Sequence, residues 1–443
     1  MAARTPSDPD VRRIQQRTVA LLAGAQVFGG IGAGATVSIG SILAVELSGS
    51  SAWAGVVATA MTLGAAVAAV PLAALADRSG RRISQVAGLL TAFGGTVLMV
   101  LATVTGLFPL LLLGAAGIGV GSAAGLQARF AAVDLAAAGS RGKALSTVVW
   151  AVTVGAVAGP NLIRPGAAVG LALGLPSTAG PFVISGTGLL VAVVIVFAGL
   201  RPDPLQLARE LAAAVPRAPA KAEDPVGGKG SLARGFRAIQ GSAGARLAVA
   251  AVVAAHAVMV GIMSMTPLHL QHVVEGPAAS QAGHHASADA LVVIGFTISL
   301  HIAGMYALSP VMGWLTDRAG RIQTIMIGLT LLLGAAAVAG LGQGSTTAVA
   351  VGLVLLGMGW SAATVAGSTL LAESVDPDSR VVVQGVSDML MGAAGAVGGA
   401  VSGLVLSWAG YPGLNMLGAV IGAGVLAVAF LSLAARRRQS APD

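Results

Sequence analysis

The six histidines of this 443-residue chain fall within one short stretch, together with a row of methionines. His256, Met259 and Met263 are spaced i, i+3 and i+7, and residues with that spacing share one face of a helix. His301 and Met305 follow, four residues apart. Imidazole and thioether groups are ligands that suit a soft ion such as Cu(I). The spacing therefore predicts a path for a soft metal ion along two helices.

Two further histidines, His269 and His272, continue the first of these helices and extend the predicted metal path toward its end. The adjacent pair His284 and His285 lies in the expected loop, where we expect both rings to be solvated. Other interpretations stay open, because methionine is common filler in apolar helices. His256 could equally carry a proton or hydrogen-bond an organic solute.

One carboxylate, Asp388, lies well inside an apolar stretch, in the sequence QGVSDMLMG. Such a group could bind and release a proton. It could instead be structural, as a hydrogen-bond partner of Ser387, Gln384 or the loop around Asp77. The sequence leaves both interpretations open.

The elements that must position these residues are membrane helices. Hydrophobic residues make up 56% of the chain and charged residues only 9%, whereas a soluble domain has about 25% charged residues. Apolar stretches of about 20 residues, each long enough to cross a bilayer as a helix, recur along the chain. Outer-membrane strands are about 10 residues long and alternate in polarity, so a barrel is excluded. We expect twelve spans, at about 18–45, 52–75, 83–105, 107–130, 143–163, 178–200, 246–270, 290–312, 322–342, 346–371, 381–407 and 411–435.

The charge pattern predicts the orientation of these spans. The formal net charge is +8, but the basic residues cluster in short segments between apolar stretches, which argues against a nucleic-acid partner. If the N-terminus is inside, every Lys and Arg except Arg164 falls on that side, so both termini are expected in the cytoplasm of a bacterial-type plasma membrane. The chain has no cysteine, which excludes disulfides and thiolate metal sites, and its polar start lacks the features of a signal peptide.

The chain contains an internal repeat. The sequence ALADRSGRR at 74–82 recurs as WLTDRAGRI at 314–322, and Asp134 has a counterpart in Glu373. Repeated halves of this kind are typical of secondary transporters. The expected division is an N-terminal tail (1–17), a six-helix bundle (18–200), a cytoplasmic linker with a short amphipathic helix (201–245), a second six-helix bundle (246–435) and a C-terminal tail (436–443).

The repeated segment resembles the loop signature of the major facilitator superfamily, which lies between the second and third helices of each half. The first copy departs only at Ala73, where the signature has glycine. The resemblance implies an all-α polytopic fold of twelve transmembrane helices in two pseudo-symmetric six-helix bundles. It also implies that both loops gate the inner side by making and breaking contacts in an alternating-access cycle. The implied gating residues are Asp77, Arg78, Gly80, Arg81, Asp317, Arg318, Gly320 and Arg321.

A second segment, running from Gly155 to Gly159 and Pro160, resembles part of a motif of the family's proton-linked exporters. Ser146 replaces an earlier glycine of that motif, and Ala115 stands where the exporters usually carry an arginine. Close packing of small residues between helices is enough to explain what remains.

The pairs Met259-x-x-x-Met263 and His301-x-x-x-Met305 resemble a narrower group, the bacterial copper importers of the same superfamily. We therefore expect a secondary active transporter that moves copper or a similar soft metal across the plasma membrane. The alternative is a proton-coupled transporter or exporter of a small organic solute or drug. The expected partners are a small solute or metal ion and the lipid bilayer. We expect a monomer with no cofactor and no enzymatic activity, since no nucleophile–base arrangement is visible in the spans.

Overall fold

A computed structural model of the chain describes residues 8–48, 56–161, 163–213, 231–276 and 288–439. Nearly all of these residues are helical, and no strand occurs among them. The all-α prediction is confirmed. The apolar composition is the reason, because a helix satisfies its own backbone hydrogen bonds where water is absent.

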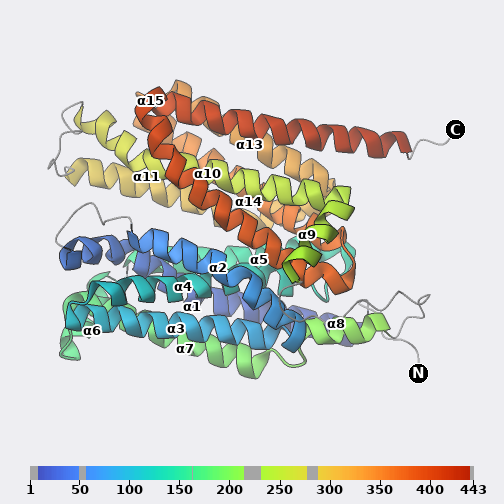
Figure 1. Cartoon of the computed structure of the whole chain (residues 1–443), viewed down its shortest axis with the longest axis horizontal. Coiled ribbons are helices and arrows are strands. Elements are labelled where there is room, and N and C mark those ends of the chain that lie inside the picture. The colour runs from blue at the N-terminus through green and yellow to red at the C-terminus, as the bar shows by residue number, and fades with distance from the viewer. Residues whose placement is uncertain (1–7, 49–55, 162, 214–230, 277–287, 440–443) are drawn as a thin grey trace. The chain divides into compact units, whose positions relative to one another are not determined.

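The first part of the chain forms α1 to α9 (Figure 1). Their bounds are α1 Pro9–Ser48, α2 Val56–Ser79, α3 Arg81–Thr105, α4 Phe108–Ala131, α5 Arg141–Asn161, α6 Ile163–Ala172, α7 Gly180–Gly199, α8 Pro204–Ala213 and α9 Ser231–Gly241. α1 begins before the expected first span, because polar residues extend the helix beyond its apolar stretch. The short helices α8 and α9 lie in the expected linker.

The second part forms α10 to α15. Their bounds are α10 Ala243–Glu275, α11 Ala288–Tyr306, α12 Ser309–Ala319, α13 Arg321–Leu341, α14 Thr346–Glu373 and α15 Pro377–Gln439. The expected eighth span is divided into α11 and α12. α15 has non-helical backbone angles at Gly410 (φ 64°, ψ −173°), so it consists of two helices joined at a sharp break.

The lengths of these helices fit a membrane. Among the described residues, nine segments are long and apolar enough to cross a bilayer, and one of them, 377–434, contains the break at Gly410. Counting that segment as two spans and adding α1 and α5 gives the twelve spans that the sequence predicts.

Close packing divides the chain into two compact units. Unit 1 comprises residues 1–242 together with 372–392, and unit 2 comprises 243–371 together with 393–443. The start of α15 therefore packs with the first part of the chain. The units are defined by packing and the expected bundles by chain order, so the predicted domain boundaries remain a prediction.

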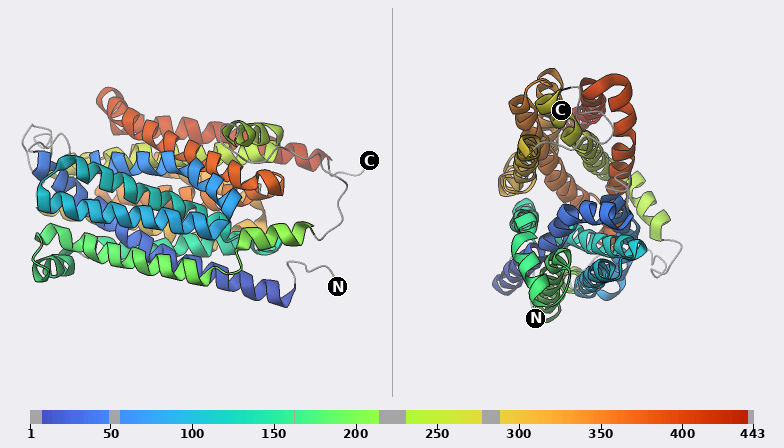
Figure 2. Two further views of the ribbon diagram at one scale, coloured as in Figure 1. Left: turned by 60° about the horizontal axis from the view of Figure 1, so that its bottom comes forward. Right: turned by 90° about the vertical axis from the view of Figure 1, so that its left-hand side faces the viewer.

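Within unit 1 the long helices lie side by side along a common direction (Figures 1 and 2). Leu22 of α1, Leu89 of α3 and Leu189 of α7 belong to one buried apolar cluster. Glycines let the backbones approach closely elsewhere: a Cβ on Gly119 of α4 would lie 2.0 Å from the carbonyl oxygen of Met61 in α2. Small residues therefore set the spacing between helices.

Within unit 2 α14 packs closely against α11. A Cβ on Gly357 would lie 2.5 Å from the carbonyl oxygen of His301, and a Cβ on Gly304 would lie 2.7 Å from that of Val354. These contacts hold the histidine-bearing stretch of α11 directly against α14.

Candidate functional site

The turn between α2 and α3 is built around Gly80. Gly80 precedes α3 with φ 90°, a backbone angle that favours glycine. The carboxylate of Asp203 lies over it: Oδ2 accepts from the Arg82 backbone N–H at 2.8 Å. Oδ1 accepts from the N–H groups of Leu205 and Gln206 at 3.0 and 3.2 Å. One buried carboxylate thus caps the N-termini of both α3 and α8.

Asp77, the first acidic residue of the repeated loop, is bound by the linker. Arg209 of α8 donates to the Asp77 carboxylate, and also to its carbonyl oxygen at 2.6 Å. Arg234 of α9 lies 3.6 Å from the other carboxylate oxygen. Asp77 is buried, so the two arginines neutralise a charge that water reaches poorly. Arg78, its neighbour, is exposed.

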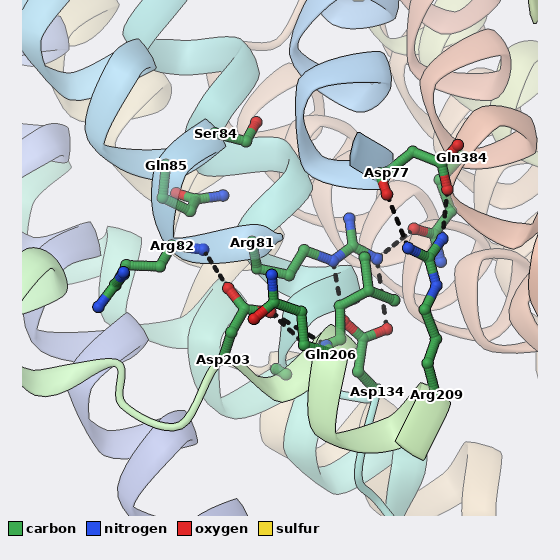
Figure 3. Close-up of polar contacts among 12 residues, drawn as sticks. Asp77, Arg81, Arg82, Ser84, Gln85, Asp134, Asp203, Gln206, Arg209 and Gln384 are labelled. Carbon is green, nitrogen blue, oxygen red and sulfur yellow. Dashed lines mark hydrogen bonds and ion pairs between the residues drawn. The ribbon is translucent and has the colours of Figure 1, made fainter. Parts of the chain in front are cut away.

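Arg81, the first residue of α3, joins three segments of unit 1 (Figure 3). Its Nε donates to Asp134 Oδ2 at 2.8 Å and its Nη2 donates to Asp134 Oδ1 at 3.3 Å. Nη2 also donates to Gln384 Oε1 of α15 at 2.7 Å. The Arg81 side chain is 1% exposed. A two-pronged contact of this kind fixes both distance and orientation.

A second buried ion pair lies on the same segment of α15. Arg129, near the end of α4, donates through Nη2 to Asp388 Oδ1, and both side chains are almost fully buried. The other carboxylate oxygen of Asp388 and the Nε of Arg129 have no hydrogen-bond partner among the described residues. Nearby, Arg141 of α5 donates to Glu373 at 3.0 Å in a more exposed pair.

The second copy of the loop signature has simpler contacts. Gly320 precedes α13 with φ 107° and so repeats the backbone geometry of Gly80. Asp317 lies 3.6 Å from Arg321, which also donates to the carbonyl oxygen of Thr316 at 3.0 Å. The guanidinium of Arg318 lies over the Trp314 ring, 5.6 Å from its centroid.

The histidine region lies in unit 2. His256 of α10 accepts a hydrogen bond at Nδ1 from the indole Nε1 of Trp360 in α14, at 3.1 Å. Tyr306, the last residue of α11, meets the Trp360 ring edge-on with 5.7 Å between centroids. Three helices therefore contribute one ring each to an aromatic group around Trp360, which is itself buried.

His301 is in a different position. It is 2% exposed, and its Nδ1 bonds to the carbonyl oxygen of Leu353 at 2.8 Å, while its Nε2 has no partner among the described residues. Met305, one turn later, and Met259 are also buried, whereas Met263 is half-buried. The structure thus places His256 and His301 against α14, at different points along it.

The remaining histidines of the predicted path lie near the end of α10. His269 stacks on Tyr411 with 3.9 Å between ring centroids, and its Nε2 bonds to the Gln343 carbonyl oxygen at 2.8 Å. The Nε2 of His272 is buried and has no partner among the described residues. Nowhere in the described part of the chain do three His, Asp, Glu or Cys side chains come together as a metal site. His284 and His285 lie outside the described residues.

The small-residue segment of α5 packs on α1. A Cβ on Gly155 would lie 2.3 Å from the carbonyl oxygen of Val27 and 2.7 Å from the Cα of Gly30. Gly159 and Pro160 lie further along α5, in a stretch whose side-chain surroundings are outside the described structure. The packing interpretation of Gly155 is supported by this close approach.

Several members of these sites are not among the residues predicted from the sequence. They are Arg129, which pairs with Asp388, and Arg209 and Asp203. One signal was present for Arg129: a charged residue close to the end of an apolar span needs a partner when it is buried. No comparable signal marks Trp360, because its partner His256 is 104 positions away in the chain.

The apolar helices and the ion-pair cluster together define a polytopic membrane protein. The model of the Major Facilitator Superfamily matches residues 20–295 and 276–443. The chain belongs to this superfamily of secondary transporters, whose members carry small solutes across membranes by alternating access.

Curated relatives match nearly the whole chain. The uncharacterized MFS-type transporter YdeG of Bacillus subtilis is 35% identical over 418 residues, covering 94% of this chain and 92% of YdeG. The riboflavin transporter RfnT of Brucella anthropi is 26% identical over 402 residues, covering 91% of this chain and 92% of RfnT.

Solved structures share the fold. The human organic anion transporter MFSD10 has a TM-score of 0.69 at 16% identity, and the match covers 94% of this chain and 99% of that one. At this identity the likeness concerns architecture only. The predicted fold of twelve helices in two bundles is confirmed.

Proposed function

We propose that the protein transports a small organic solute and binds it beside the aromatic group formed by His256, Tyr306 and Trp360. The observation that carries this proposal is the hydrogen bond from Trp360 Nε1 to His256 Nδ1. Organic ligands are commonly bound by aromatic walls with a few fixed polar groups. An imidazole held by a neighbouring indole supplies such a fixed group.

The hydrogen bond also determines which ring nitrogen can act on a solute. Because Nδ1 accepts from the indole, a neutral His256 carries its proton on Nε2. The neighbouring position in α15 is a glycine, Gly395, at which a Cβ would lie 2.9 Å from this Nε2. The His256 edge that bears the proton thus packs closely against the backbone of α15 at Gly395. A planar solute suits the aromatic walls of this group.

One relative's name suggests the first solute to test. RfnT is named as a riboflavin transporter, and the isoalloxazine ring of riboflavin is planar and rich in acceptors. The test is uptake of radiolabelled riboflavin by liposomes that contain the purified protein, with an imposed proton gradient. The proposal expects saturable uptake that His256→Ala reduces at least tenfold while Met263→Leu leaves it unchanged. Uptake that His256→Ala does not affect would contradict it.

Copper transport is a second proposal, and one observation favours it. His301 bonds through Nδ1 to a backbone carbonyl, and its buried Nε2 has no partner among the residues that the structure describes, an arrangement that metal-binding histidines often have. Met305 is buried one turn away. The same liposomes would be given ⁶⁴Cu(I), and this proposal expects uptake that Met263→Leu combined with His301→Ala abolishes. Equal copper uptake by the wild type and this variant would contradict it.

For the gating step, we propose that the unit 1 ion pairs form and break in each cycle. Hydrogen bonds from Arg81 to Asp134 and Gln384 join three segments that are far apart in sequence. These segments are α3, the turn that follows α4, and the start of α15. Asp317 and Arg321 take the equivalent part in the second loop. Gln384→Ala should then shift the balance of conformations, which double electron–electron resonance between spin labels on α3 and α15 would detect. Unchanged distance distributions would speak against the gate.

We propose a positioning role for Asp388 in which its pair with Arg129 holds α15 against α4. Proton coupling through Asp388 would require that pair to open during the cycle. The two roles differ in one measurement: proton-driven uptake by Asp388→Asn. If Asp388 has a positioning role, the variant should show reduced uptake that still depends on the proton gradient. If Asp388 couples transport to protons, the variant should exchange solute in a way that no longer responds to the gradient.

The proposed location is a bacterial-type plasma membrane with both termini in the cytoplasm. The segregation of basic residues to one side supports this orientation. Because the chain has no cysteine, a single cysteine introduced at the N-terminus can be tested with an impermeant maleimide in intact cells. We expect the cysteine to stay unlabelled until the cells are opened. Labelling in intact cells would indicate the opposite orientation.

A further inference from the structure

α14 carries three buried hydroxyls that no group in the described part of the chain satisfies. Ser361, Thr364 and Ser368 are each at most 1% exposed. None of their hydroxyl oxygens has a hydrogen-bond partner among the described residues. A buried hydroxyl without a partner costs free energy, so each such group calls for an explanation.

The usual solution for a hydroxyl in an apolar helix is a bond to its own backbone, one turn earlier. Thr369 of the same helix makes this bond, donating to the Val365 carbonyl oxygen at 2.8 Å. Thr266 of α10 does likewise with Ile262 at 2.8 Å. Ser361, Thr364 and Ser368 are exceptions within a helix that offers the usual bond.

The three hydroxyls form a line on one side of α14. Their spacing is i, i+3 and i+7, which puts them on a common face. The line starts next to Trp360 at the middle of the helix and continues toward its C-terminal end. It is therefore an extension of the aromatic group rather than a separate feature.

Contacts of neighbouring positions show which side this is. Gly367 approaches Val252 of α10, with 2.6 Å from its ideal Cβ to Cγ2, and Gly357 approaches α11. At 100° per residue, Thr364 lies between those two directions, and Ser361 and Ser368 lie on the α11 side of it. The hydroxyls thus lie on the side of α14 that is turned toward α11, with Thr364 the nearest to α10; these two helices also contribute Tyr306 and His256.

Charge limits what these groups can bind. In the described part of unit 2, charged residues occur only near helix ends: Arg246, Glu275, Asp289, Asp317, Arg318, Arg321 and Arg436 to Arg438. An ionic group beside the hydroxyl line would have no counter-charge from unit 2, and burying such a group is costly. Hydroxyls both donate and accept, which suits an uncharged polar solute.

We propose that Ser361, Thr364 and Ser368 form the hydrogen-bonding track of the solute path, and that the solute is an uncharged organic molecule with several hydroxyl or carbonyl groups. This inference rests on the proposed transport of an organic solute. It adds the specificity-determining residues and the charge class. As the solute moves along α14, it satisfies hydroxyls that are unsatisfied without it.

The first test uses the absence of cysteine from the chain. Ser361→Cys, Thr364→Cys and Ser368→Cys are each treated with a water-soluble methanethiosulfonate in membranes. The matched control is Thr369→Cys, one residue after Ser368 and about 140° around the helix from Thr364. All three track cysteines should react at least tenfold faster than the control. Labelling no faster than at Thr369→Cys would overturn the track, whatever the solute is.

The second test concerns the solute. The triple variant Ser361→Ala, Thr364→Val, Ser368→Ala should raise the KM for riboflavin, the probe of the uptake assay above, by about tenfold or more, since up to three hydrogen bonds are lost. Thr369→Val should leave it unchanged. The wild type should take up riboflavin 5′-phosphate at least tenfold less well. An unchanged KM, or equal uptake of the phosphate, would overturn the proposed specificity.

The two tests separate the inference from the function on which it rests. If the wild type takes up no riboflavin, the organic-solute proposal loses its first candidate, and cysteine labelling still decides whether the hydroxyls line a water-filled path. If riboflavin is taken up but the track cysteines stay unreactive, the transport proposal stands and the track is wrong.

Discussion

Arg129 and Asp388 form an ion pair in which each side chain is at most 2% exposed, although the two residues are 259 positions apart in the chain. Only one oxygen of Asp388 is bonded to the arginine. Two opposite charges removed from water stabilise each other, but either charge left alone at this depth would be strongly unfavourable.

Breaking this pair should destabilise the protein sharply. Arg129→Gln leaves the Asp388 carboxylate buried without a counter-charge, so we expect the free energy of unfolding to fall by about 3–5 kcal/mol. Adding Asp388→Asn should recover part of the loss, because it removes the uncompensated charge. Thermal unfolding in detergent micelles measures both variants. A double variant less stable than Arg129→Gln alone would contradict the pairing.

Removing the Asp77 charge should release α8. Asp77→Asn loses the attraction of Arg209 and Arg234, which are partly exposed to solvent, so the effect on overall stability should be at most about 1 kcal/mol. The effect should instead be local, as faster hydrogen–deuterium exchange across Pro204–Ala213. Glu210→Gln, at an exposed position of the same helix, is the control and should leave exchange unchanged. Identical exchange in both variants would show that Asp77 does not hold the linker.

A side chain at Gly80 should be poorly tolerated. Gly80 has φ 90°, and a Cβ there would lie 2.5 Å from a carboxylate oxygen of Asp203. Gly80→Ala should therefore lower the free energy of unfolding by about 1–3 kcal/mol. Gly94→Ala is the matched control, because Gly94 lies in α3 with nothing within 4 Å of its ideal Cβ. Its stability should equal or exceed that of the wild type, and a reversed order would refute the prediction.

The indole hydrogen bond should matter for solute uptake. Trp360→Phe keeps an aromatic ring but leaves His256 Nδ1 without its donor, so the preferred proton position on the imidazole is lost. We expect the KM for riboflavin to rise about three- to tenfold, in line with the loss of one hydrogen bond. Trp408→Phe, at an 85% exposed position, should behave as the wild type. Equal KM values for all three proteins would remove His256 from the site.

The class of fold could be predicted because it depends on properties that can be read directly along the sequence. Apolar stretches long enough to span a bilayer give the helices, the segregation of basic residues supports the orientation, and the repeat of Asp77 at Asp317 indicates two related halves. The turns at Gly80 and Gly320 could be anticipated for the same reason, since a positive φ favours one residue type.

The individual side-chain contacts could not be predicted in this way. The sequence showed that Asp388 is an isolated acid, and three partners were considered for it, but Arg129 was not among them. The sequence places His256 and His301 on one predicted path along two helices. In the structure, His256 is hydrogen-bonded to Trp360 and His301 to the Leu353 carbonyl oxygen, at separate points along α14.

By itself, the sequence determined that this chain is a bundle of membrane helices in two repeated halves, since hydrophobic length, charge and repetition can be read without knowing any contact. Only the tertiary structure decided which buried groups meet: Arg129 with Asp388, Asp77 with Arg209, and His256 with Trp360. The physical reason is that a pairing depends on the rotation and close approach of each helix. Those are set by the fit of many small residues, such as Gly119 against Met61, rather than by the residues that form the pair.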